Sequence, residues 1–156
     1  MIEPLRVLTT EPLSMASIAM RVPRSQIQTV MGPALIELRA GIANQNIAVT
    51  GPWFTHHVRP PGDMFDFEIC LPVTAPVAAA GRMRPGSWPA MTVARTVYHG
   101  GFEGLGQAWS AFIGQIGAAG HPMADDLWER YLVGPDANAD ASCWRTELSK
   151  PLLGKT

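Results

Sequence analysis

The order of predicted secondary-structure elements occurs twice along the chain, and this repeat constrains the fold more than any other feature. In each half, the spacing of apolar residues predicts one strand, then an amphipathic helix, then two more strands. The predicted strands cover 14–22, 51–58, 64–73, 90–101, 127–133 and 142–152, and the predicted helices cover 23–45 and 102–120. Two such strand–helix–strand–strand units predict an α+β fold, in which an antiparallel sheet carries two helices on one face.

The two halves share few identical residues, so the repeated order of elements is the main evidence for a duplication. The alignment pairs Glu68 with Glu147 and Pro72 with Pro151, and it brings Phe54 near Glu129 and His56 near Tyr131. We expect a single domain over residues 1–156, because a chain of this length is typical of one domain. Its first repeat would cover about 1–75 and its second repeat about 80–156.

Local signals predict where several elements begin and end. Ser25 and Gln28 have the spacing of a capping box at the start of the first helix. Pro33 interrupts the helical pattern, so it is either the first residue of a helix or a kink within a longer one. The segment 59–63, RPPGD, predicts the turn between two strands, and a short strand is expected near 80–84.

Charge and hydropathy argue against several classes of protein. The chain has 12 basic and 13 acidic residues, a formal net charge of −1, whereas a nucleic-acid-binding surface requires a basic excess. No segment reaches the roughly 18 consecutive apolar residues of a membrane span. The first residues, MIEPLRVLTTEP, lack the features of a signal peptide, so we expect a cytoplasmic protein.

The chain offers little for a metal or a cofactor. Cys70 and Cys143 lie far apart without metal-ligand spacing, and we expect both to be buried, unreactive thiols. His56 and His57 are consecutive strand residues, whose side chains point to opposite faces, so they do not form a metal pair. We expect neither a metal nor a cofactor.

Four segments of the second half resemble one protein family. These segments are MRPGSWPAMTVAR, VYHGGFEGLGQAW, WERYLVGPD and CWRTELSKPL. Their order and spacing are similar to those of the GyrI-like, or AraC-type effector-binding, domains, which also form the drug-sensing half of some multidrug-responsive transcription activators. The resemblance covers about residues 5 to 152. The chain departs from the family at Gly101-Phe102, where Pro-Tyr is preferred, and at Tyr98, where His is common.

The resemblance implies a ligand cleft between the two halves and binding of bulky, flat, often cationic aromatic compounds. In several relatives the glutamate of the E-x-Y segment is the acidic group of the pocket, and Glu129 stands at that position here. Some stand-alone members of the family resemble hydrolases that open cyclopropane-bearing genotoxins with pocket glutamate and aromatic groups. This chain is also expected to be stand-alone, because too few residues precede residue 5 for a helix-turn-helix segment.

Strand alternation sorts the candidate residues around Glu129. Glu129 and Tyr131 should share one face of their strand, the predicted cleft side, while Trp128 and Leu132 should share the core side. In a half-buried aromatic cleft, Glu129 would attract a cationic ligand or serve as a general acid or base. A solvated strand carboxylate is the alternative reading. Tyr131 would hydrogen-bond and stack on the ligand, or it would be a core tyrosine.

Three residues of the other predicted elements complete the candidate site. Phe54 and His56 share one face of the matching strand in the first half, and Trp88 follows Pro85-Gly86 in a connector, where it would stack on a flat ligand. The alternatives are a surface histidine for His56 and a tryptophan that covers the end of the core for Trp88. Trp109 lies on the apolar stripe of the second helix, so we expect it in the core.

Three functions follow from these features. The first is binding of a hydrophobic, aromatic and often cationic small molecule, with Glu129 and Tyr131 in the pocket and Phe54, His56 and Trp88 as further ligand contacts. The second is hydrolysis of an electrophilic small molecule by the same Glu129 and Tyr131 as catalytic residues. The third is a protein-interaction module that resembles an inhibitor of gyrase. None of the three needs direct contact with nucleic acid or a membrane.

Overall fold

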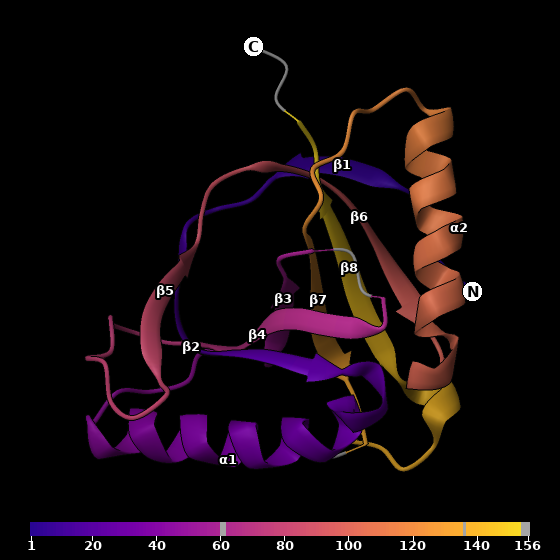
Figure 1. Ribbon diagram of the computed structural model, residues 1–156. Coiled ribbons are helices and arrows are strands. Elements are labelled where there is room, and N and C mark those ends of the chain that lie inside the picture. The colour runs from indigo at the N-terminus through magenta and orange to yellow at the C-terminus, as the bar shows by residue number, and fades with distance from the viewer. Residues whose placement is uncertain (60–61, 136, 154–156) are drawn as a thin grey trace. The chain divides into compact units, whose positions relative to one another are not determined.

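The computed structural model describes residues 1–59, 62–135 and 137–153, and it divides the chain into two compact units (Figure 1). The first-repeat unit consists of Glu11–Ala90. The second-repeat unit consists of Met1–Thr10 together with Met91–Thr156. Each unit contains four antiparallel strands and one α-helix within the described residues.

The first-repeat unit is built around one long helix. Its elements are β2 (Leu13–Pro23), η1 (Arg24–Gln26), α1 (Ile27–Asn44), β3 (Phe54–His57), β4 (Met64–Pro72) and β5 (Arg84–Trp88). The strands lie in the order β3-β4-β2-β5. Alternate residues of β2 and β4 point at α1, so Ile18 and Ile69 are fully buried against the helix residues Leu38 and Ile42.

The second-repeat unit has the same plan. Its elements are β1 (Arg6–Thr9), β6 (Thr92–His99), η2 (Phe102–Gly104), α2 (Leu105–Ala118), β7 (Leu127–Val133), η3 (Ala141–Cys143) and β8 (Arg145–Pro151). The strands lie in the order β1-β6-β8-β7. The apolar stripe of α2, including Phe112 and Ile116, packs on Ala94, Leu127 and Leu148 of the strands. The predicted α+β fold with duplicated antiparallel units is therefore confirmed.

One strand of each unit comes from an unexpected part of the chain. β1 precedes β2 in sequence but pairs with β6, and β5 precedes β6 but pairs with β2. The alternation of apolar residues did not reveal β1, because its four residues are mostly exposed. The short strand expected near 80–84 instead covers Arg84–Trp88, and the segment before it forms only a single bridge between Ala80 and Met83.

The start of α1 differs from the prediction. Ser25 lies inside the 3₁₀ turn η1, and the residue that precedes α1, Gln26, makes no side-chain capping bond. The capping box of Ser25 and Gln28 is therefore wrong, because α1 begins at Ile27, which places Gln26 at the N-cap and Thr29 at the third helical position. Pro33 lies within α1, which settles its two readings in favour of a position inside a longer helix. Pro60 and Pro61 of the expected turn lie outside the described residues.

The register of the strands corrects the alignment of the two halves by one residue. His56 pairs with Glu68 across β3 and β4, and Arg130 pairs with Glu147 across β7 and β8. If the two glutamates are equivalent, His56 corresponds to Arg130, and the first-half equivalent of Glu129 is Thr55. Since neighbouring strand residues point to opposite faces, this one-residue difference changes the face on which Phe54 and His56 lie.

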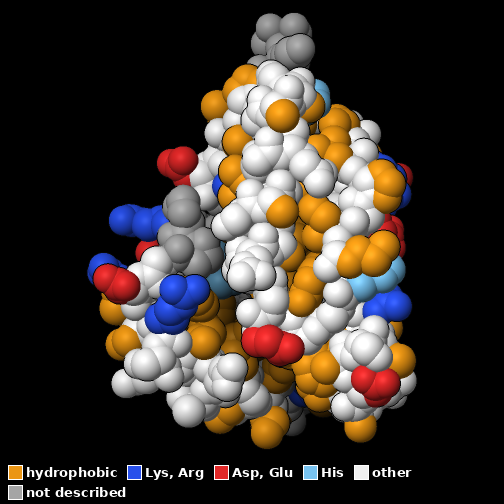
Figure 2. Space-filling model, turned by 90° about the vertical axis from the view of Figure 1, so that its right-hand side faces the viewer, with side chains coloured by type: hydrophobic (Ala, Val, Ile, Leu, Met, Phe, Trp, Pro, Cys, Tyr) orange, Lys and Arg blue, Asp and Glu red, His pale blue; other side chains and the backbone are white. Residues whose placement is uncertain are grey.

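The outer surface of α2 carries no charge. The helix Leu105–Ala118 contains no Asp, Glu, Lys or Arg, and Figure 2, which views the molecule from the side of α2, shows a white and orange surface along it. Among the described residues, no helix is long and apolar enough to cross a membrane.

Two glycines of the second-repeat unit give a matched test of packing. A Cβ on Gly104 would meet the Tyr98 hydroxyl, which donates to the Gly101 carbonyl at 2.8 Å, whereas a Cβ on the exposed Gly114 would meet nothing within 4 Å. We expect Gly104→Ala to lower the free energy of unfolding by about 1–3 kcal/mol because it overpacks a buried contact. Gly114→Ala should raise it by about 0.5–1 kcal/mol through helix propensity.

Urea denaturation of both variants measures the difference. Adding Tyr98→Phe to Gly104→Ala removes the hydroxyl oxygen and should restore part of the loss. Equal effects of the two alanines would contradict a steric role for the Tyr98 hydroxyl.

Candidate functional site

A buried carboxylate lies on β7 of the second-repeat unit. Glu129 is in the middle of β7 and is only 8% exposed. The Trp109 indole nitrogen Nε1 donates a hydrogen bond to Oε2 of Glu129 at 2.6 Å. The Tyr131 hydroxyl donates to Oε1 at 2.6 Å. Both carboxylate oxygens are therefore held by one donor each.

The local sequence explains how these three side chains meet. Residues i and i+2 of a strand share a face, so Glu129 and Tyr131 both point from β7 toward α2. Trp109 lies on the inner stripe of α2, between Leu105 and Phe112, and it therefore faces the strands. Helix packing brings the polar edge of this tryptophan onto the carboxylate.

The buried carboxylate has no positively charged neighbour. Among the described residues, no Lys, Arg or His lies within ion-pair distance of Glu129. Its two donors, an indole and a phenol, are neutral, and a buried charge with only neutral donors is costly to keep away from water. A cation placed beside Glu129 would supply the missing countercharge.

Further aromatic rings pack against the two donors of this carboxylate. Phe102 meets Tyr131 edge to face with ring centroids 5.8 Å apart, and its other neighbour is Trp144 at 4.9 Å. Trp109 packs against Phe112 at 6.0 Å. We call Phe102, Trp109, Phe112, Tyr131 and Trp144 the aromatic cluster. Phe112 is fully buried, and the half-buried Phe102 and Trp144 are the members with ring surface left on which a flat or cationic ligand could stack.

A threonine on the same face adds an unused polar group. Thr146 pairs with Tyr131 across β7 and β8, so its side chain shares the α2 side of the strands. It is fully buried, and its hydroxyl oxygen Oγ1 has no hydrogen-bond partner among the described residues. Buried polar groups almost always have a partner, so this hydroxyl calls for an explanation.

The structure places the remaining candidates in the first-repeat unit. Phe54, His56 and Trp88 lie on the face of its strands opposite α1. The rings of Phe54 and Trp88 are 5.4 Å apart, and both residues are buried. Trp88 ends β5 and does not lie in a connector. The His56 ring nitrogen Nδ1 lies 3.1 Å from Oε1 of Glu68.

Glu68 was not among the predicted site residues. Ser17 Oγ donates to its second oxygen at 3.4 Å, so the glutamate joins β2, β3 and β4 on this face. The alternation of Asp66, Glu68 and Cys70 in β4 was visible in the sequence, but the pairing register that brings His56 to Glu68 was not. Only the tertiary structure identifies this polar group.

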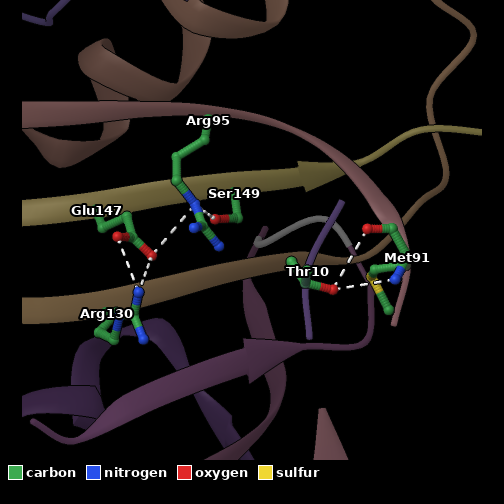
Figure 3. A network of polar contacts seen from close by, with 6 residues as sticks. All are labelled: Thr10, Met91, Arg95, Arg130, Glu147 and Ser149. Carbon is green, nitrogen blue, oxygen red and sulfur yellow. Dashed lines mark hydrogen bonds and ion pairs between the residues drawn. The ribbon is translucent and has the colours of Figure 1, made fainter. Parts of the chain in front are cut away.

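The opposite face of the second-repeat unit carries a buried ion network (Figure 3). Glu147 Oε1 lies 2.9 Å from an Arg130 nitrogen and 3.3 Å from Arg95 Nε. Arg95 Nε also donates to Ser149 Oγ at 2.9 Å. Burial lowers the pKa of the Arg95 guanidinium, and the Glu147 carboxylate opposes that shift. Arg130 therefore points away from Glu129, although the two residues are adjacent in sequence.

Two sequence predictions about single residues need correction. Leu132, expected on the core side with Trp128, is 40% exposed, because the pairing of β7 with β8 slips between Tyr131 and Val133. Trp128 is buried, but on the face that points away from α2. Cys143, expected to be buried, is exposed in η3, whereas Cys70 is buried and its burial raises the pKa of its thiol.

The residues described here contain no group of three or more metal-ligating side chains. Trp109 was predicted as a core residue, and it is buried, but its N–H serves the carboxylate. Thr146 gave no signal in the sequence, since a threonine in a strand is ordinary.

The duplicated fold is shared with several solved structures, in agreement with the fold that the resemblance to GyrI-like effector-binding domains implies. No family model matches the chain, and no curated protein matches it. The fold is therefore shown by solved structures alone.

The C-terminal domain of EcmrR is one such structure. It is 19% identical, with a TM-score of 0.85, and the match covers 97% of this chain and 98% of that domain. The match to the EcmrR chain in a complex with DNA covers only 58% of that EcmrR chain. A hydrolase from Listeria innocua matches with a TM-score of 0.68 at 10% identity over 96% of this chain and 91% of the hydrolase. SAV2435 bound to tetraphenylphosphonium matches with a TM-score of 0.63 at 12% identity, and the match covers 97% of this chain and 95% of SAV2435.

Proposed function

We propose that this protein binds a bulky aromatic cation at Glu129. The observation that carries the proposal is a buried carboxylate that is held by two neutral donors, Trp109 and Tyr131, and has no cation beside it among the described residues. The aromatic cluster would supply apolar contact area, and Glu129 would supply charge and orientation. Cation–π contact with the rings would add about 0.5–2 kcal/mol to binding.

The similar structures support this choice of ligand. SAV2435 was determined with tetraphenylphosphonium, a bulky aromatic cation. EcmrR, whose C-terminal domain shares the fold, was determined in a complex with DNA. For the present chain we propose small-molecule binding in the cytoplasm without direct contact with nucleic acid. A protein partner, including the gyrase-inhibitor alternative, stays a prediction.

Within the first-repeat unit, taken by itself, we propose Phe54, His56 and Trp88 as ligand contacts. The buried pair of Phe54 and Trp88 supports an aromatic role, and the hydrogen bond of His56 to Glu68 gives this face of the first-repeat unit a polar group beside the rings. The decisive test of the proposed function is the charge of Glu129. Removing this charge should weaken the binding of tetraphenylphosphonium far more than the binding of a neutral aromatic compound.

Hydrolysis of an electrophilic small molecule is a second candidate function. The Tyr131 hydroxyl lies 2.6 Å from the Glu129 carboxylate, which is the spacing of an acid–base pair. Glu129 would deprotonate a water molecule whose oxygen bonds to a cyclopropane carbon as the ring C–C bond breaks. Tyr131 would donate a hydrogen bond to the conjugated carbonyl oxygen of the substrate, which takes up the electron pair and then a proton. The Listeria innocua hydrolase shares the fold.

Incubation with a cyclopropane-bearing alkylator, followed by mass spectrometry, separates the two functions. Hydrolysis predicts a ring-opened product that carries one added water and forms in excess over the protein. Glu129→Gln and Tyr131→Phe should each slow its formation. Stoichiometric, unchanged ligand would instead favour binding alone.

A further inference from the structure

We infer that the ligand of the Glu129 site is a protonated amine that carries a second hydrogen-bonding group, and that Thr146 recognises this second group. The inference rests on the proposed function, because it takes Glu129 as the acid of the site. It goes further by distinguishing amine cations from quaternary cations, which have no N–H to donate.

The first argument is the unused acceptor capacity of Glu129. An ionised carboxylate has about four acceptor positions on its two oxygens. Trp109 fills one position on Oε2, and Tyr131 fills one on Oε1. The positions that remain can accept hydrogen bonds from an ammonium group. A quaternary cation would gain charge attraction here but would leave these positions empty, and buried acceptors without donors weaken binding.

The second argument is the hydroxyl of Thr146. Two threonines point toward α2 from the central strands of this unit, Thr96 and Thr146. The Thr96 hydroxyl donates to the Glu3 carbonyl at 2.7 Å. The Thr146 hydroxyl has no such partner among the described residues, although the side chain is fully buried. A ligand group would give this hydroxyl the partner that buried polar groups normally have.

The first repeat shows that the fold does not require a polar residue at this position. If Glu68 and Glu147 are equivalent, the counterpart of Thr146 is Phe67, which is buried in the core against α1. An apolar side chain is therefore compatible with this place in the fold. The hydroxyl costs stability when it is buried without a partner, so its presence favours a role in recognition.

The positions of the two polar groups fit one ligand. Glu129 pairs with Leu148 on β8, and Thr146 stands two residues from Leu148, so Glu129 and Thr146 are diagonal neighbours on the same face. Such neighbours lie roughly 7–8 Å apart in an antiparallel pair, so one small ligand can reach both polar groups. An aryl amino alcohol, with its amine and hydroxyl on neighbouring carbons, matches this arrangement.

Three related probes test the inference by calorimetry at neutral pH. The first is an aryl amino alcohol with a protonated secondary amine, the second lacks its hydroxyl, and the third is its N-methylated quaternary form. We expect the first to bind the wild-type protein about twofold to tenfold more tightly than either of the others, the usual effect of one hydrogen bond. In Thr146→Val the first and second probes should bind equally. In Glu129→Gln the preference for the amine over the quaternary form should disappear.

Thr146→Ser is the matched control, because it keeps the hydroxyl and should keep the preference for the first probe over the second. Thermal melts of the variants confirm that each is folded. Equal binding of the amine and its quaternary form by the wild-type protein would overturn the inference, as would a hydroxyl preference that survives in Thr146→Val. If tetraphenylphosphonium also binds equally well to the wild-type protein and to Glu129→Gln, the proposed function itself fails.

Discussion

Glu129→Gln is expected to weaken binding of tetraphenylphosphonium by about tenfold to a hundredfold, the effect of losing one interaction with a charged group. The substitution removes the charge but preserves the shape of the side chain. The glutamine oxygen can accept from Trp109, and its amide can donate to the Tyr131 hydroxyl, which also accepts hydrogen bonds. The affinity for a neutral compound such as triphenylphosphine oxide should therefore fall by less than about twofold, because apolar contacts dominate its binding. Tryptophan fluorescence follows both titrations, since Trp109 and Trp144 belong to the aromatic cluster.

Glu11→Gln is the control for net charge in this experiment. Glu11 is an exposed carboxylate outside the strands and helices, so its loss changes the charge of the protein by the same amount without touching the site. It should leave both affinities unchanged. Equal loss for the cation and the neutral compound in Glu129→Gln would show that the glutamate shapes the site without acting through charge. No loss for either would remove Glu129 from the site.

The second large effect concerns stability and arises on the other face of the second-repeat unit. Glu147→Gln should lower the free energy of unfolding by about 3 kcal/mol, the scale for removing one member of a buried ion pair. Glu147 is 7% exposed and neutralises two guanidinium groups, those of Arg95 and Arg130 (Figure 3). After the substitution both positive charges remain in a partly buried place, and the repulsion between them is no longer offset. Urea denaturation measures the loss.

The chain contains a matched exposed pair for comparison. Arg82 donates to Glu37 at 2.8 Å, and both side chains are largely in solvent. Glu37→Gln should therefore cost less than about 1 kcal/mol, as exposed ion pairs do. The effect at Glu147 should persist in about 1 M salt, whereas the effect at Glu37 should vanish, because salt screens exposed charges more than buried ones. Similar losses at the two positions would show that the Glu147 network contributes no more than a surface pair.

Much of the fold was predictable because it depends on local patterns. The alternation in β4 and β7 and the apolar stripe of α2 follow directly from the residues, and the structure has these elements at nearly the expected places. The exchange of β1 and β5 between the repeats was not predictable. Edge strands are short and mostly exposed, so they lack the periodic burial that marks a strand in sequence.

The candidate site was predictable only in part. Glu129 and Tyr131 were assigned to one face of their strand, on the side opposite the core, but the structure places both on the α2 side of β7, with the core residues Leu127 and Leu148. Phe54 and His56 were aligned with them, but the register of β3 assigns that place to Thr55. A one-residue error in a strand inverts the faces, and sequence similarity between the repeats is too low to fix the register.

The sequence alone determined that the chain folds as two strand–helix–strand–strand units and that a glutamate lies in an apolar strand of the second. It did so because the periods of helices and strands are local properties. Only the tertiary structure decided which groups donate hydrogen bonds to Glu129. The indole of Trp109 and the hydroxyl of Thr146 reach the face of that glutamate because α2 and β8 pack beside β7, and such contacts between distant segments leave no trace in local spacing.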